Sequence, residues 1–170
     1  MSERGSCCGS GCRHCPYSHE NIPPEKRSEL IQQPCWLSEP PSSGEPSDIL
    51  FWSGGKDSFL TLLELEETAS SNLILLTTFD ALQRRVAHQE IPIDQIVRQA
   101  RHLGLPLLGV PLHPGRDYFD IVEPALRLVA QPGRFVFGDL HLEHIRSWRE
   151  KAFSGLSGKL GVPLSFPPLA

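Results

Sequence analysis

The sequence predicts an α/β fold, in which a three-layer α/β/α domain with a mostly parallel, five-stranded sheet follows a small cysteine-rich segment. Two observations lead to this prediction. From Asp48 onward, apolar runs of strand length alternate with longer amphipathic stretches. One run, residues 73–78, is continuous, which is typical of a strand that helices cover on both faces. Repeated βα units of this kind predict parallel strands with helices on both sides of one sheet.

The expected elements follow one another in a regular order. Strands are expected at residues 49–52, 73–78, 106–111, 135–137 and 162–166. Helices are expected directly after the segment 53–58 and at residues 91–104, 117–130 and 140–153. Gly104 is the expected stop of the second helix, Pro124 a kink in the third, and Asp139 the N-cap of the fourth.

Length and charge limit the classes of protein that fit. The 170 residues can form one domain of ordinary size with an appendage. The net charge of −4 and the pI near 6.0 argue against a surface that coats nucleic acid. There is no run of about 18 apolar residues and no apolar leader at the N-terminus, so no membrane span or secretory signal is expected. These features predict a soluble, cytoplasmic protein.

A polar, proline-rich segment divides the chain by composition. Residues 38–47 read Ser-Glu-Pro-Pro-Ser-Ser-Gly-Glu-Pro-Ser and offer nothing to bury, so they are predicted to be a linker. The division places a cysteine-rich module at residues 1–37 and the α/β domain at residues 48–170. Cys35 is expected to be a buried or incidental thiol.

Four cysteines lie within nine positions near the N-terminus: Cys7, Cys8, Cys12 and Cys15. The spacing of the last two suits a metal-binding knuckle, and four thiolates suit Zn²⁺ or an iron–sulfur cluster. His14 or His19 can replace one thiolate, because the adjacent Cys7 and Cys8 reach one ion only with a strained backbone. Redox-active thiols and inert thiols in a flexible arm are the alternatives. The range 7–21 also resembles a short cysteine-rich module with the pattern CCGxGCxxCPYxHEN, which has no established role.

The segment Ser53-Gly54-Gly55-Lys56-Asp57-Ser58 connects the first expected strand to the first expected helix. Adjacent glycines allow a sharp turn and expose backbone N–H groups with no Cβ in the way. These N–H groups lie at a helix N-terminus, where the helix dipole favours an anion, and Lys56 adds a full positive charge. The segment therefore predicts a phosphate-binding loop, the alternative being an ordinary glycine-rich turn between strand and helix.

This loop is not a Walker A motif, because Leu50 stands where the first glycine belongs and Asp57 where Ser or Thr follows the lysine. It resembles instead the PP-loop of the ATP pyrophosphatases, which have the signature SGGxDS and split ATP into AMP and pyrophosphate. The resemblance implies that ATP phosphates and Mg²⁺ are bound by Ser53, Gly54, Gly55, Lys56, Asp57 and Ser58.

Two other strand ends are expected to meet this loop, because the carboxyl ends of parallel strands share one edge of the sheet. They are the residues 77–80 and the pair Gly138-Asp139. Thr77 and Phe79 would contact the adenosine by backbone contacts and packing, or they are ordinary strand-end residues.

Further segments resemble one branch of the PP-loop proteins, the diphthine–ammonia ligases (diphthamide synthases) and their bacterial relatives. They are Thr78-Phe79-Asp80, Arg84-Arg85-Val86-Ala87-His88, and Phe137-Gly138-Asp139-Leu140-His141-Leu142-Glu143 with Arg146 and Trp148-Arg149-Glu150. The likeness covers about residues 48–167. It implies an ATP-dependent ligase that activates a carboxylate for amide formation, with ATP, Mg²⁺, a carboxylate-bearing acceptor and ammonia as its ligands.

The same resemblance assigns roles outside the loop. Lys56, Asp57 and Asp139 would be catalytic, with an aspartate on Mg²⁺ and Gly138 beside the nucleotide. Arg85 and His88 would lie on a mobile loop over the site. The plainer interpretations are that His88 is a solvated loop histidine and that Asp139 is a helix cap. Glu143, Arg146 and Glu150 would then form a salt-bridged exposed face.

The likeness stops near residue 167, whereas full-length relatives continue with a segment that shapes the acceptor pocket. The half that would select diphthine is therefore expected to be absent from this sequence. Two alternatives stay open: a PP-loop enzyme that transfers sulfur, with the cysteines as a relay, and a non-catalytic nucleotide-binding module whose cysteine-rich arm docks to a partner.

Overall fold

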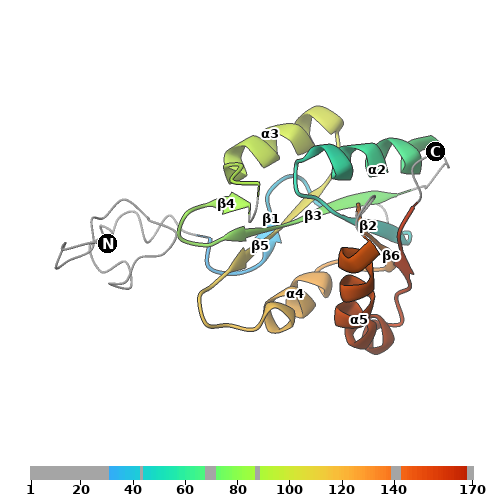
Figure 1. Cartoon of the computed structure of the whole chain (residues 1–170). Helices are drawn as coiled ribbons and strands as arrows, with labels where there is room; N and C mark the ends of the chain where they lie inside the picture. The colour runs from blue at the N-terminus through green and yellow to red at the C-terminus, as the bar shows by residue number, and fades with distance from the viewer. Residues whose placement is uncertain (1–30, 43, 68–71, 87–88, 139–142, 168–170) are drawn as a thin grey trace.

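The computed structural model describes residues 31–42, 44–67, 72–86, 89–138 and 143–167. These residues form an α/β fold with a seven-stranded mixed sheet and four helices (Figure 1). The strands are β1 (Cys35–Trp36), β2 (Ser47–Phe51), β3 (Leu73–Asp80), β4 (Arg85–Val86), β5 (Leu107–Leu112), β6 (Pro132–Val136) and β7 (Leu164–Ser165). The helices are α2 (Lys56–Glu67), α3 (Ile93–Leu103), α4 (Tyr118–Leu126) and α5 (Glu143–Leu160).

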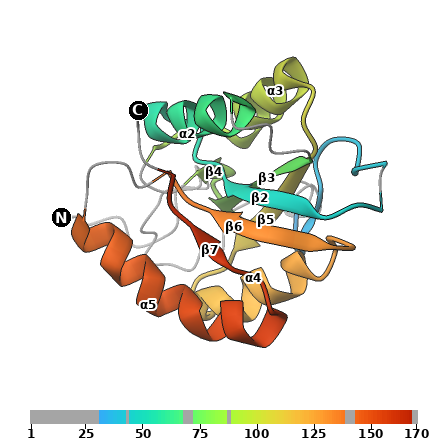
Figure 2. The same cartoon turned by 90° about the vertical axis from the view of Figure 1, so that its right-hand side faces the viewer.

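The strand β2 lies between the two halves of the sheet. The strand order is β1-β5-β3-β2-β6-β7, and β4 pairs with β3 off this path. β2 is parallel to both of its neighbours, with Leu50 opposite Leu75 in β3 and Val136 in β6. The chain leaves β2 on one side to form β3 and β5, then crosses to the other side to form β6 and β7 (Figure 2). The strand order therefore reverses beside β2, and ligand sites in open α/β sheets are expected at such a point.

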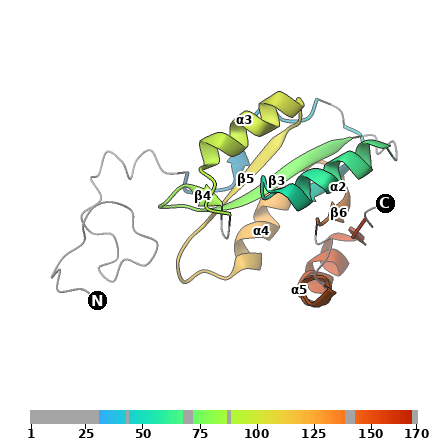
Figure 3. The ribbon, with the colours of Figure 1, turned by 45° about the horizontal axis from the view of Figure 1, so that its top comes forward.

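Two helices cover each face of the sheet (Figures 1 and 3). Successive strand residues face opposite layers, as β geometry requires. Leu50 and Leu75 belong to the core that packs with α2 and α3. Ile49 and Ile74 belong to the core that packs with α4 and α5. All four side chains are fully buried, so the predicted three-layer arrangement is confirmed.

The predicted α/β class is confirmed, and all five predicted strands appear, as β2, β3, β5, β6 and β7. The predicted number of five is nevertheless wrong, because the two-residue strands β1 and β4 join the same sheet. A two-residue strand has no periodicity to read, so its existence depends on a partner elsewhere in the chain. Cys35 and Trp36 of β1 pair with Gly109 and Leu108 of β5, so part of the range assigned to the cysteine-rich module contacts the α/β body.

Local sequence sets several helix ends. α3 ends at Gly104, whose left-handed φ of 67° allows its N–H to bond to carbonyls of the last turn. α4 begins after Asp117, whose carboxylate accepts the Phe119 N–H at 2.8 Å. Pro124 lies inside α4 and the helix continues only to Leu126, short of the predicted residue 130. α5 extends to Leu160, past the predicted end at residue 153, and the expected cap Asp139 lies outside the described residues.

No helix in the described part of the chain is both long and apolar enough to span a membrane.

Two glycines provide opposite tests of this packing. A Cβ on Gly109 would lie 2.4 Å from Leu37 Cδ1, so Gly109→Ala is expected to destabilise the fold by about 1–3 kcal/mol and to weaken the attachment of β1. A Cβ on Gly155 of α5 would meet nothing within 4 Å, so Gly155→Ala is expected to stabilise by about 0.5–1 kcal/mol. Urea unfolding measures both changes. An unchanged Gly109 variant or a destabilised Gly155 variant would contradict the packing described here.

Candidate functional site

The candidate site lies where β2 and β6 end side by side. α2 follows β2 and packs on one face, whereas α5 follows β6 and packs on the other face. The segments after these two parallel strands therefore diverge, and in open α/β sheets ligands bind beside such a divergence, outside the carboxyl ends of the strands. Residues 53–55 lead from β2 into α2 at this point, and Gly138 follows β6. The structure thus brings the predicted loop and the predicted Gly138 together.

The loop has a defined internal geometry. Gly54 has a φ of 75°, a left-handed conformation that favours glycine. The Ser53 hydroxyl accepts the Gly55 N–H at 3.3 Å and lies 3.2 Å from the Ser58 hydroxyl. Ser58 in turn donates to the Gly55 carbonyl at 2.9 Å. Both predicted serines therefore hold the turn in shape, and Ser58 is buried while doing so.

The first turn of α2 carries the groups that remain available to a ligand. The first N–H groups of a helix have no intrahelical acceptor. Among the described residues, no hydrogen bond takes up the N–H of Lys56 or Asp57. Both side chains are exposed, and neither forms an ion pair within the described part of the chain. Two N–H groups, one ammonium and one carboxylate are therefore open to a ligand at the start of α2.

Helix α3 and Gln89, four residues before it, cover the glycines of the loop from one side. A Cβ on Gly54 would lie 2.4 Å from Ile96 Cδ1 and 2.8 Å from Gln99 Oε1. A Cβ on Gly55 would lie 3.2 Å from the side-chain amide of Gln89. Gly54 is therefore favoured by its left-handed φ as well as by these close contacts, whereas at Gly55 the exposed Gln89 side chain would have to shift slightly, and both glycines are half-buried.

Gln99 is a site residue that sequence reasoning missed. Its side-chain oxygen accepts the Trp52 indole N–H at 3.0 Å, and its side-chain nitrogen donates to the Gly54 carbonyl at 3.3 Å. One amide thus connects α3 with the residue before the loop and with the loop itself. No sequence signal marks it, because it is one of several polar residues on an amphipathic helix.

Gly138 packs directly on the start of α2. A Cβ on Gly138 would lie 3.0 Å from the Thr61 hydroxyl and 3.1 Å from the Asp57 carbonyl oxygen. A side chain at this position would push β6 away from the loop. The predicted neighbour Asp139 lies outside the described residues, as do His88, Cys7, Cys8, Cys12 and Cys15.

Thr77 and Phe79 lie on β3 with fully buried side chains. Phe79 belongs to the core beneath α2 and α3, and it pairs with Val86 of β4 and Pro111 of β5, so its ring is closed to a ligand in this conformation. The Thr77 hydroxyl is buried without a hydrogen-bond partner among the described residues.

The predicted arginines contact nearby residues of their own segments. The Arg85 side chain donates to the carbonyl of Glu90, five positions later, at 2.5 Å. Arg146 pairs with Glu150 at 3.0 Å, as the predicted salt-bridged face requires.

The residues on the opposite face of the sheet, under α5, are aromatic and cationic. The rings of Phe51 and Phe137 stack at 4.5 Å, and Phe166 stacks on Phe137 at 5.3 Å. The guanidinium carbon of Arg149 lies 4.7 Å from the Phe137 ring centre, and that of Arg146 lies 5.0 Å from the Phe166 ring centre. These separations are within the range of cation–π contacts.

Tyr118, at the start of α4, lies beside this cluster. Its ring makes an edge contact with Phe153 at 6.1 Å. Burial raises the pKa of Tyr118 from 10.0 to about 12, although the charge of Arg149 and a hydrogen bond with Thr78 act in the opposite direction. Tyr118 therefore stays a neutral hydrogen-bonding group at neutral pH.

No group of three or more His, Cys, Asp or Glu side chains that could hold a metal occurs in the described ranges. The exposed carboxylate of Asp57 is the acidic group of the loop. Mg²⁺ bound with a nucleotide commonly takes one or two protein carboxylates together with phosphate oxygens and waters. This donor set fits Mg²⁺ that arrives with a nucleotide and does not form a closed protein site.

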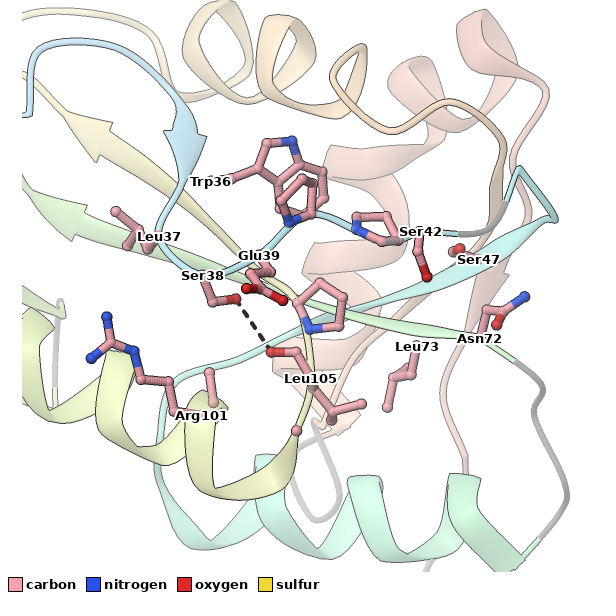
Figure 4. A pocket seen from close by; sticks show the side chains of 15 residues that line it. Trp36, Leu37, Ser38, Glu39, Ser42, Ser47, Asn72, Leu73, Arg101 and Leu105 are labelled. Atoms are coloured by element: carbon pink, nitrogen blue, oxygen red, sulfur yellow. Dashed lines mark hydrogen bonds between the residues drawn. The ribbon is translucent and has the colours of Figure 1, made fainter.

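A cavity of about 910 Å³ lies at the other edge of the sheet (Figure 4). Its lining includes Leu73 at the start of β3, Pro106 just before β5, and Trp36. Ser38 closes one side, donating to the Leu105 carbonyl at 3.4 Å (Figure 4) and accepting the Leu107 N–H at 2.7 Å. Because this cavity is at the amino ends of the strands, it is separate from the loop at residues 53–58, which lies at the carboxyl end of β2.

The N-terminal residues match a known family. Residues 1–21 match a family of unknown function (DUF5522). The match contains all four clustered cysteines and supports a discrete cysteine-rich segment there, and it supplies no activity.

The role of Gln99 can be measured separately from any ligand. Gln99→Met removes the acceptor of the buried Trp52 N–H and is expected to cost about 1–3 kcal/mol of unfolding free energy. Gln95→Met, one turn earlier on an exposed position of α3, is the matched control and is expected to change stability by less than about 0.5 kcal/mol. Equal urea midpoints for the two variants would show that the Gln99 contacts contribute nothing to the free energy of unfolding.

Tyr118 predicts a pH dependence of stability. Its pKa is higher in the folded chain than in the unfolded chain, so both states keep the proton below pH 10 and the folded state alone keeps it between pH 10 and 12. The free energy of unfolding is expected to fall across that window, by at most about 2–3 kcal/mol. Urea unfolding at a series of pH values should show a shallower fall for Tyr118→Phe. If the free energy of unfolding fell equally with pH in both proteins, the raised pKa would not belong to Tyr118.

Proposed function

We propose that this chain binds ATP at the carboxyl edge of its sheet and splits it into AMP and pyrophosphate, in order to activate a carboxylate for amide formation. The observation that carries the proposal is the position of the Ser53–Ser58 loop. It lies at the point where the strand order reverses, and it leads directly into the N-terminus of a 12-residue helix. The resemblance of the same six residues to a PP-loop supports this assignment.

The loop offers suitable groups for the diphosphate part of ATP. The free N–H groups of Lys56 and Asp57 lie at the positive end of the α2 dipole, which favours an anion by about 0.3–1 kcal/mol. The Lys56 ammonium adds a mobile full charge. The turn that presents these groups is held by the Ser53 and Ser58 hydroxyls, so little reordering is needed when phosphate binds.

These groups favour adenylation because of where charge develops. A carboxylate oxygen attacks the α-phosphorus, and the bond from that phosphorus to the bridging oxygen breaks. The electron pair leaves with pyrophosphate, so negative charge grows on the group that the loop holds. Mg²⁺ bound with the nucleotide would neutralise phosphate charge, and the exposed carboxylate of Asp57 would hold it. The ammonia nitrogen then bonds to the acyl carbon, AMP leaves with the electron pair of the broken acyl C–O bond, and one proton passes from nitrogen to solvent to give the amide.

Lys56→Ala tests the proposal by removing the positive charge of the loop. We expect the wild-type chain to bind ATP with Mg²⁺ in calorimetry, and we expect the variant to bind at least about tenfold more weakly, which corresponds to roughly 1.4 kcal/mol. Lys151→Ala, a change at an exposed lysine on α5, is the matched control and should bind like wild type.

Turnover is measured in the same proteins by ATP–pyrophosphate exchange with candidate carboxylic acids. Exchange that requires an acid and Lys56 supports a ligase. Failure of the wild-type chain to bind any adenine nucleotide with Mg²⁺ would refute the proposal, as would full ATP-to-AMP turnover by Lys56→Ala.

A further inference from the structure

One exposed side chain from a separate segment lies directly on the loop. A Cβ on Gly55 would lie 3.2 Å from the amide carbon of Gln89, 3.2 Å from its Oε1 and 3.3 Å from its Nε2. Because these three distances are nearly equal, the flat amide group faces Gly55, and its oxygen and nitrogen lie at the sides of the contact.

The pairing of the strands explains why Gln89 reaches the loop. Phe51, at the end of β2, pairs with Leu76, whereas β3 continues to Asp80. The last two residues of β3 pair with β5 on one side and with β4 on the other, so β4 lies on the side of β2, beyond its end. Gln89, three positions after β4, therefore lies beside the segment that follows β2.

The turn that carries Gln89 is closed by hydrogen bonds on both sides of this residue. The N–H of Val86 donates to the Ile91 carbonyl at 2.9 Å, and the N–H of Glu90 donates to the Val86 carbonyl at 3.1 Å. The Arg85 guanidinium donates to the Glu90 carbonyl at 2.5 Å. Glu90 has a left-handed φ of 54°, which is uncommon for a residue other than glycine. The backbone that presents the amide is therefore defined before any ligand binds.

The amide of Gln89 is open to a ligand. The residue is exposed, and within the described ranges its side chain takes part in no hydrogen bond. A glutamine amide offers two N–H donors and one carbonyl acceptor. Lys56 directly follows Gly55, and its backbone N–H is also without an acceptor among the described residues. Open donors of two different segments therefore lie on either side of Gly55.

These donors are close enough to bind one phosphate group. Covalent geometry places the Lys56 nitrogen within about 4 Å of a Cβ on Gly55, and the Gln89 nitrogen lies 3.3 Å from the same point. The two nitrogens are therefore at most about 7 Å apart. Two hydrogen bonds of about 2.9 Å, made to oxygens of one phosphate group, can span such a distance.

We propose that Gln89 is a phosphate-binding residue of the nucleotide site, whose amide donates a hydrogen bond to the pyrophosphate part of ATP beside the Lys56 N–H. This inference rests on the proposed function. Gln89 transfers no proton and forms no covalent bond. Negative charge grows on the departing pyrophosphate during adenylation, and a hydrogen bond to a charged acceptor is stronger than one to a neutral acceptor.

The test measures binding to the full chain by calorimetry with two probes, ATP with Mg²⁺ and pyrophosphate with Mg²⁺. Gln89→Ala removes the amide, and Gln89→Glu replaces it with a carboxylate of the same length. Gln131→Ala is the matched control, at an exposed glutamine that precedes β6 and so lies at the amino edge of the sheet. All three variants should keep the melting temperature of wild type, because both glutamines are exposed.

Wild type and the control are expected to bind both probes. Gln89→Ala should bind each of them about tenfold more weakly, which is the loss expected for one hydrogen bond to a charged acceptor. Gln89→Glu should bind them more weakly still, because its carboxylate repels phosphate. This additional loss should become smaller at high salt, which screens the repulsion.

Other outcomes would overturn the inference. Unchanged ATP binding by Gln89→Ala would do so and leave the proposed function in place. Equal losses in the Ala and Glu variants at every salt concentration would give Gln89 a packing role only. Pyrophosphate binding that is absent from an ATP-binding wild type, or unchanged in the variants, would exclude a contact with this part of ATP. Absence of adenine-nucleotide binding in wild type would overturn the proposed function and this inference together.

Discussion

The parallel pairing of β2 with both β3 and β6 is the constraint on which the rest of the structure depends. Ile49 and Leu50 are completely buried, one on each face of the sheet, so β2 can only lie where helices cover both sides. Because β2 lies between the two halves, the strands that follow it are placed first on one side of it and then on the other. The loop at residues 53–58 and Gly138 meet at one edge as a direct consequence.

The two faces of this edge differ in chemistry because different helices supply them. On the α2 side, a turn held by hydroxyl and amide groups presents backbone N–H groups and Lys56. On the α5 side, stacked rings carry two guanidinium groups. Positive groups thus lie on both faces of the sheet near the carboxyl ends of β2 and β6, although the whole chain has a net charge of −4. An anionic ligand at this position would find local attraction that the overall charge does not reveal.

The packing of the loop links its shape to the stability of the fold. Gln99 connects α3 to Trp52 and Gly54, and Gly138 fits against the first turn of α2 with no room for a Cβ. A change in α3 or in β6 therefore alters the loop even though neither contains it. Pre-organised sites commonly depend on such support, because the groups that contact a ligand must hold their positions before it binds.

The sequence by itself determined the α/β class, five of the seven strands, the stop of α3 at Gly104 and the loop at residues 53–58, because these depend on periodicity and on the local conformations of glycine and proline. Only the tertiary structure decided that β1 and β4 join the sheet, that Gln99 supports the loop, that Phe79 is enclosed in the core, and that Arg149 lies over Phe137. The physical reason is that local pattern specifies which residues are buried, whereas the choice of partner depends on the crossing of segments far apart in the chain. Trp52 and Gln99 are 47 positions apart, and no pattern in either segment indicates the hydrogen bond between them.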